Sequence, residues 1–116
     1  MPLIIKSRLV SQVVVLDLIG RLWILDLPLR DKIAGLLNEG HRHFVVNLSD
    51  VDYIDSSGLG QLVSIWTSIK NRSGHMTLLN PTKRVGKLLQ ITKLNTIFEI
   101  LEVEPEAVKR AGGSAT

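Results

Sequence analysis

Two adjacent hydroxyls, Ser56 and Ser57, stand in the stretch YIDSSGLGQL, between a strand-like segment and a helix-like one. Asp55 precedes them, and Gly58 and Gly60 follow. A serine at the start of a helix commonly caps it, because its oxygen accepts a backbone N–H that has no partner inside the helix. We expect one serine to do this. The glycines remove side-chain bulk, so the other hydroxyl should be open to whatever docks there.

A nucleophilic serine is one chemistry that this stretch suggests. The turn that carries the nucleophile of α/β-hydrolases reads G-x-S-x-G, and here Ile54 or Asp55 stands where the first glycine should be. Any general base would have to be one of the three histidines, which we expect at the surface or at strand edges: His41, His43 and His75. G-L-G also lacks the third glycine of a dinucleotide site and the Gly-Lys-Ser/Thr of a P-loop. We therefore expect no enzyme, no catalytic residue and no cofactor.

A regulatory phosphorylation site fits the stretch better. A phosphoryl group adds about −1.5 to −2 charges. At the start of a helix the unpaired N–H groups and the helix dipole favour an anion, so the domain itself would tolerate the modification. For a partner docked over the same spot, the phosphate is a solvated anion beside Asp55. Such a hydroxyl can switch binding without unfolding the protein.

Size and composition indicate one globular domain. The chain has 116 residues, of which 45% are hydrophobic. It has no cysteine, which excludes a disulfide framework, a thiolate metal site and a cysteine nucleophile. Its apolar runs are far shorter than the ~20 residues that span a bilayer, and it shows no signal-peptide pattern at its start. We expect a cytoplasmic domain over residues 1–111, with a flexible tail over 112–116 and no metal or membrane contact.

Charge is unevenly distributed along the chain. Fourteen Lys and Arg stand against eleven Asp and Glu, a net charge of +3. No acid occurs from Ser56 to Phe98, a stretch whose basic residues include Lys70, Arg72, Lys83, Arg84, Lys87 and Lys93. Ordinary solvated faces are the favoured interpretation. Nucleic-acid binding is not expected, because the only interleaved aromatic residue is Trp66, whose helical spacing suggests the core.

Hydrophobic periodicity predicts alternating strands and helices. The clearest helical stripe consists of Leu29, Ile33, Leu36 and Leu37. Strands are expected at 3–10, 13–19, 43–48, 75–80 and 96–101, and helices at 28–40, 59–72, 81–94 and 104–111. Gly20 should end the second strand, residues 49–55 should form a polar turn, and Asn80 should cap the third helix. The order β-β-α-β-α-β-α-β-α predicts an α/β fold with a mixed sheet and parallel neighbours after the opening hairpin.

Residues 13 to 101 resemble the STAS domain of bacterial anti-sigma-factor antagonists. D-S-S-G-L-G, following a short apolar strand and opening a helix, carries the resemblance, together with LLNPTKRVGKLLQITKL downstream. The resemblance implies a four- to five-stranded mixed sheet with helices mainly on one face. It also implies a module that binds an anti-sigma factor with serine-kinase activity and so releases a sigma factor.

Ser56 falls on the serine that the kinase phosphorylates in this family, and a phosphatase would reverse the modification. Asp55 would then shape the loop that the kinase recognises, and Ser57 would be the capping or structural hydroxyl. The start of the docking helix would be Gly58, Leu59 and Gly60.

One segment departs from the family pattern. Where members typically show an acidic G-E-L-D after the second strand, this chain has GRLW, with Arg21 and Trp23, and Asp26 is displaced by three positions. The apolar segment from Leu22 to Leu29 either packs into the core or forms an exposed patch, which would mean a changed partner or a homodimer. A structural STAS module of a larger signalling assembly is therefore the alternative function.

Overall fold

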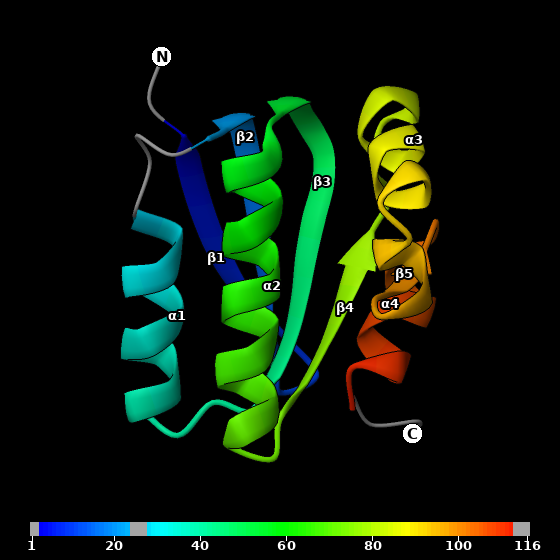
Figure 1. Ribbon diagram of the computed structural model, residues 1–116. Coiled ribbons are helices and arrows are strands. Elements are labelled where there is room, and N and C mark those ends of the chain that lie inside the picture. Colours follow the sequence, from blue (N-terminus) through cyan, green and yellow to red (C-terminus); the bar gives the residue numbers. More distant parts are fainter. Residues whose placement is uncertain (1–2, 24–27, 113–116) are drawn as a thin grey trace.

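The computed structural model describes residues 3–23 and 28–112, and within them a single five-stranded sheet is covered by helices (Figure 1). The strands lie in the order β1 (Ile4–Val10), β2 (Val13–Leu22), β3 (His43–Ile54), β4 (His75–Leu79) and β5 (Glu99–Leu101). β1 runs antiparallel to β2, and every other pair is parallel. The helices are α1 (Pro28–Asn38), α2 (Ser56–Asn71), α3 (Lys83–Ile91) and α4 (Glu104–Arg110), with a 3₁₀ turn η1 (Leu94–Thr96). The predicted fold class and element order are confirmed.

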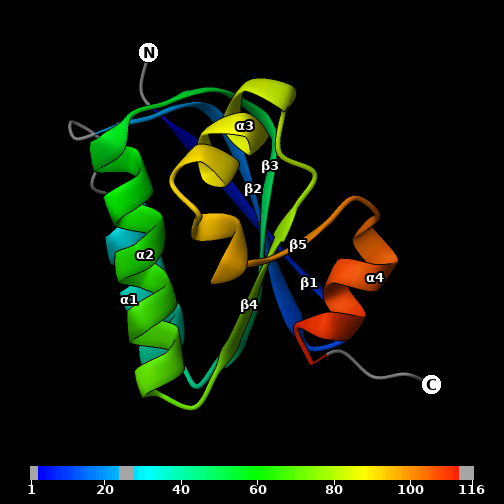
Figure 2. The same ribbon diagram turned by 45° about the vertical axis from the view of Figure 1, so that its right-hand side comes forward.

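Two apolar cores lie on opposite faces of the sheet. Val14 and Leu16 of β2 belong to the larger core, under α1, α2 and α3, whereas Val13 and Val15 belong to the smaller one, under α4. This follows from the alternation of side chains along a strand. Figure 2 shows α4 set apart from the other helices. The helices thus lie mainly on one face, as expected, and α4 alone covers the other.

β2 and β3 are longer than the sequence predicts. Gly20 does not end β2: it takes a positive φ of 116° at a register shift, and the strand continues to Leu22. Residues 49–55 are not a turn, because β3 runs on to Ile54 and pairs with β2 along the way. Val51 and Ile54 are buried in the larger core, whereas Asp50, Asp52 and Tyr53 are exposed. This extension pairs Arg21 with Tyr53.

The start of α3 also differs from the prediction. Asn80 has a left-handed φ of 49° and does not cap the helix. The cap is Thr82, whose side-chain oxygen accepts the N–H of Val85 at 3.3 Å. In α1 the predicted stripe is confirmed, since Leu29 and Ile33 are buried.

Gly58 fixes how closely α2 approaches the end of β2. A Cβ atom at this position would lie 2.1 Å from the backbone oxygen of Leu22 and 2.8 Å from Cγ1 of Ile54. Gly58 is therefore buried, and its role is to allow this close packing. The expectation that it keeps the surface around a serine hydroxyl clear is wrong. Gly60 is exposed, and a Cβ atom added there would meet nothing within 4 Å.

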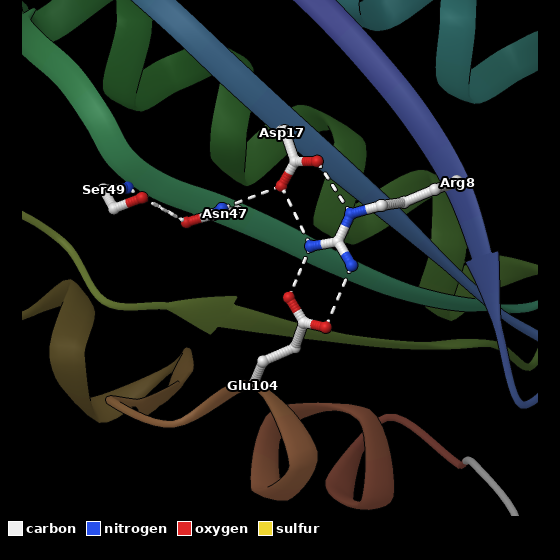
Figure 3. A network of polar contacts seen from close by, with 5 residues as sticks. All are labelled: Arg8, Asp17, Asn47, Ser49 and Glu104. Carbon is white, nitrogen blue, oxygen red and sulfur yellow. Dashed lines mark hydrogen bonds and ion pairs between the residues drawn. The ribbon is translucent and has the colours of Figure 1, made fainter.

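A polar network ties α4 to three strands on its face of the sheet (Figure 3). Arg8 Nε donates to Asp17 Oδ2 at 2.8 Å, and Arg8 Nη1 donates to Glu104 Oε2 at 2.9 Å. Asn47 Nδ2 donates to Asp17 Oδ1 at 2.7 Å, and Ser49 Oγ donates to Asn47 Oδ1 at 2.8 Å. The hydrogen bonds from Arg8 lower the pKa of both carboxyl groups. The network therefore depends on ionised carboxylates.

We expect Gly58→Ala to lower the free energy of unfolding by about 1–3 kcal/mol, because the methyl group overlaps the Leu22 carbonyl and α2 must shift. Gly60→Ala is the matched control, and we expect it to raise stability by about 0.5–1 kcal/mol, as alanine does for glycine in an open helical position. Urea unfolding of both variants measures the difference. Equal stabilities for the two would contradict the close approach.

The Arg8 network should make the free energy of unfolding depend on pH in the acidic range. Because the folded-state pKa values of Asp17 and Glu104 are lowered, their contribution is present at neutral pH and is lost as pH falls through those values. All three side chains keep some exposure to solvent, so we expect Arg8→Met to cost about 1 kcal/mol at pH 7. The difference in free energy of unfolding between Arg8→Met and the parent, measured by urea unfolding, should become smaller at about pH 3.

Arg110→Met is the control for this prediction. Its 3.3 Å pair with Glu99 is far more exposed, with 67% and 47% of the two side chains accessible, so its loss should change little at either pH. A loss of stability in Arg8→Met that does not change with pH would show that Asp17 and Glu104 are not paired with Arg8.

Candidate functional site

The predicted site residues come from two distant segments that meet at one end of the sheet. The carboxyl ends of β2 and β3 lie beside the first turn of α2 (Figure 1). There Leu22 pairs with Ile54 in neighbouring strands. This pairing brings Arg21 and Trp23 near the turn that carries Ser56. Ligands of open α/β sheets commonly bind beyond the carboxyl ends of parallel strands.

Asp55, and not a serine, caps α2. Its backbone is extended (φ −109°, ψ −176°), and its Oδ1 accepts the N–H of Gly58 at 2.7 Å. The carboxylate also has a favourable charge for this end of the helix dipole. The expectation that Ser57 or Ser56 supplies the capping hydroxyl is therefore wrong. With the cap filled by Asp55, neither serine is needed for that purpose.

The two serines differ in exposure. Ser56 is exposed and Ser57 is half-buried. Within the described part of the chain, no residue forms a hydrogen bond with the Ser56 hydroxyl. Ser56 is thus a hydroxyl on the first turn of a helix, open to solvent and without a structural partner among those residues.

The remaining residues of the motif divide between core and surface. Gly58 and Leu59 are buried, with Leu59 only 6% exposed in the larger core, so they position the helix and are not available for contact. Gly60 is exposed one helical turn after Ser56. Residues at i and i+4 lie on the same helix face, so Gly60 leaves open the surface beside the Ser56 hydroxyl.

Arg21, Trp23 and Tyr53 form a cation–aromatic cluster at the strand ends. The Trp23 and Tyr53 rings meet edge to face, with centroids 6.4 Å apart and planes at 81°. The guanidinium carbon of Arg21 lies 5.6 Å from the Trp23 centroid and 5.8 Å from that of Tyr53. Each such contact contributes about 0.5–1 kcal/mol at an exposed site. The two residues that depart from the family pattern therefore pack together on Tyr53.

Gln61 connects this cluster to α2. It is 6% exposed, and its Nε2 donates to the backbone oxygen of Trp23 at 2.7 Å. Its Oε1 is buried without a hydrogen-bond partner among the described residues. Neither Gln61 nor Tyr53 could be predicted as a site residue from the sequence, because their roles come from pairing between strands and from contacts across the fold.

The apolar segment after β2 is only partly described. Leu22 and Leu29, at its two ends, are fully buried in the core. Residues 24–27, which include Asp26, lie outside the described residues, as do residues 113–116 of the expected tail. Within the described ranges, no helix has the length and apolarity needed to cross a bilayer.

Two of the histidines lie far from Ser56. His43 and His75 begin β3 and β4, whereas Ser56 follows the last residue of β3, so the full length of that strand separates them. His43 Nδ1 lies 2.7 Å from the backbone oxygen of Ala111. A serine nucleophile activated by one of these two histidines is incompatible with this arrangement.

Comparison with known proteins gives consistent matches. The STAS domain family model matches residues 11–107. A Thermotoga neapolitana protein named as a candidate anti-sigma factor antagonist is 38% identical over 77 residues, which cover 66% of this chain and 68% of that protein. The anti-sigma-B factor antagonist of Listeria monocytogenes is 38% identical over 61 residues, 53% of this chain and 54% of its own length.

A solved structure extends the similarity to the whole fold. The crystal structure of a candidate anti-sigma factor antagonist from Thermotoga maritima has a TM-score of 0.84 and 32% identity, and covers 92% of this chain and 93% of that one. The residues that the STAS family model matches include all the strands from β2 to β5 and the first turn of α2. With nearly the whole sheet and the serine turn inside the match, this chain belongs to the STAS domain family.

Proposed function

We propose that this protein is an anti-sigma-factor antagonist whose binding is switched by phosphorylation of Ser56. The observation that carries the proposal is the exposed Ser56 hydroxyl on the first turn of α2, beside a helix cap that is already filled by Asp55. A kinase can reach this oxygen without opening the domain. Membership of the STAS family, with relatives named as antagonists, supports the same role.

The helix start explains why the domain tolerates the phosphate. Backbone N–H groups of the first turn and the helix dipole favour an anion there, while Asp55 satisfies the N–H of Gly58. The modification therefore leaves the core unchanged. A partner lying over Ser56 and Gly60 would have to displace water from a doubly charged group near Asp55.

The partners follow from this role. In the unphosphorylated state the protein would bind an anti-sigma factor with serine-kinase activity and release its sigma factor. Phosphorylation by that kinase would end the binding, and a phosphatase would restore it. We place this cycle in the cytoplasm, where sigma factors act.

Incubation with ATP and an anti-sigma-factor kinase, ideally one encoded beside this protein, should add one phosphate that Ser56→Ala abolishes. Ser57→Ala is the control. It should still accept the phosphate on Ser56, because the hydroxyl that it removes is half-buried and is not the proposed acceptor. Mass spectrometry of the intact protein and of its peptides reads the result. A phosphate found only on residues other than Ser56 would refute the site.

Ser56→Asp should weaken binding to the anti-sigma factor by about tenfold or more, which corresponds to about 1.4 kcal/mol. The cause is a negative charge placed where the partner must lose water. Ser68→Asp is the matched control, since Ser68 is exposed on the same helix about three turns further on. Isothermal titration calorimetry compares the variants, and equal losses for both would argue against a local switch.

A further inference from the structure

An apolar groove lies between the end of β3 and α3, next to the proposed switch. It has a volume of about 300 Å³. Its lining consists of Tyr53, Ile54, Arg84, Lys87, Leu88 and Ile91. Ile91 is 67% exposed and Tyr53 38% exposed, unusual for side chains of this size. No residue of this lining is acidic.

The groove is continuous with the cation–aromatic cluster. Tyr53 belongs to both, because one side chain lines the groove and also contacts Trp23 and Arg21. The two features therefore form one surface, which we call the β3–α3 surface. It carries three cations around an apolar strip: Arg21, Arg84 and Lys87.

These three cations lack carboxylate partners within the described part of the chain. Arg8 and Arg110, by contrast, form ion pairs with Asp17, Glu104 and Glu99. The sequence reinforces the difference, since no acid occurs between Ser56 and Phe98. A partner that covered the surface with apolar side chains alone would remove water from the cations and offer nothing in return.

We propose that the β3–α3 surface docks a segment of the partner protein in which carboxylates flank apolar side chains. The apolar side chains would fill the groove over Ile54, Leu88 and Ile91, and the carboxylates would pair with the surrounding cations. Arg84 and Lys87 lie one turn apart on α3, so carboxylates with a similar spacing on one face of the segment can reach both.

A nucleic acid fits the surface less well than such a segment. Single strands bind through aromatic side chains on which bases stack. Here the groove is mainly aliphatic, and Trp23 is engaged edge to face with Tyr53. Trp66 is partly buried against the core and packs edge to face with Phe98, with ring centroids 6.3 Å apart. Charge and shape together favour an acidic peptide segment.

The inference deepens the proposed function and rests on it, because it names the chemistry of the partner. Ser56 lies three residues after Tyr53. A phosphate there would repel the partner's carboxylates and would compete with them for the same cations. The phosphate would thus act on affinity through charge as well as through bulk.

The test uses the full chain, labelled with ¹⁵N, and two short synthetic peptides with identical leucine and phenylalanine anchors. In one peptide glutamates flank the anchors, and in the other lysines do. We expect the glutamate peptide to shift the amide signals of residues 53–54 and 84–91 in saturable fashion, more weakly at high salt, and the lysine peptide to shift none of them.

Arg84→Glu with Lys87→Glu should weaken binding of the glutamate peptide about tenfold or more. Lys32→Glu with Lys109→Glu makes the same change of charge at exposed positions on α1 and α4, outside the groove, and should leave the affinity nearly unchanged. The amide spectrum of each variant also verifies that it is folded. A glutamate peptide that binds both double variants equally well would overturn the inference.

Other outcomes would also overturn it. These are saturable binding of the lysine peptide, binding of a single-stranded oligonucleotide at the same residues with equal affinity, or a dimer in sedimentation whose contacts map to the groove. The peptide experiment needs no kinase, so its failure beside normal phosphorylation of Ser56 would reject the docking surface alone. Specific binding of the glutamate peptide, together with no phosphorylation of Ser56, would reject the switch alone.

Discussion

The close approach of Gly58 to the Leu22 carbonyl is the constraint on which the site depends. The 2.1 Å that would separate a Cβ from that oxygen leaves no room for any other residue type in this geometry. It brings the first turn of α2 directly against the end of β2. From that one contact follow the burial of Leu59, the reach of Gln61 to the Trp23 carbonyl and the outward position of Ser56. The hydroxyl is exposed because the residues that follow it are held inward.

The extension of β2 past Gly20 and of β3 to Ile54 forms the part of the site that contains Arg21 and Tyr53. Backbone pairing continues through the register shift, so Arg21 and Tyr53 lie opposite each other on adjacent strands. Without that extension the two aromatic rings and the guanidinium would belong to separate loops. Strand pairing thus orders the surface beside the proposed switch, which would lower the entropy cost of docking a partner there.

The element order and the α1 stripe could be predicted from the sequence because hydrophobic periodicity is a local signal. The extension of β3 could not, since Ser49, Asp50 and Asp52 have the composition of a turn and only the neighbouring strand holds them in a sheet. The capping role of Asp55 was missed for a different reason. Aspartate and serine are about equally good caps, so local sequence cannot rank the adjacent candidates. The need for glycine at position 58 could not be predicted either, because it comes from the close approach to Leu22, a residue distant in the sequence.

The ion pairs of Asp17 and Glu104 lie on one face of the sheet, and the proposed docking surface lies on the other. Asp17 and Glu104 are engaged with Arg8 in holding α4 on its face of the sheet, where their charges are compensated within the domain. The helices on the other face carry basic residues without an ion pair in the described part of the chain, most densely at Lys83, Arg84 and Lys87. A surface whose cations are not already paired responds strongly to a single added charge, because no ion pair within the domain has compensated its potential. One phosphoryl group on Ser56 would then be a large change for a partner that recognised those cations, even though it would be a small one for the fold.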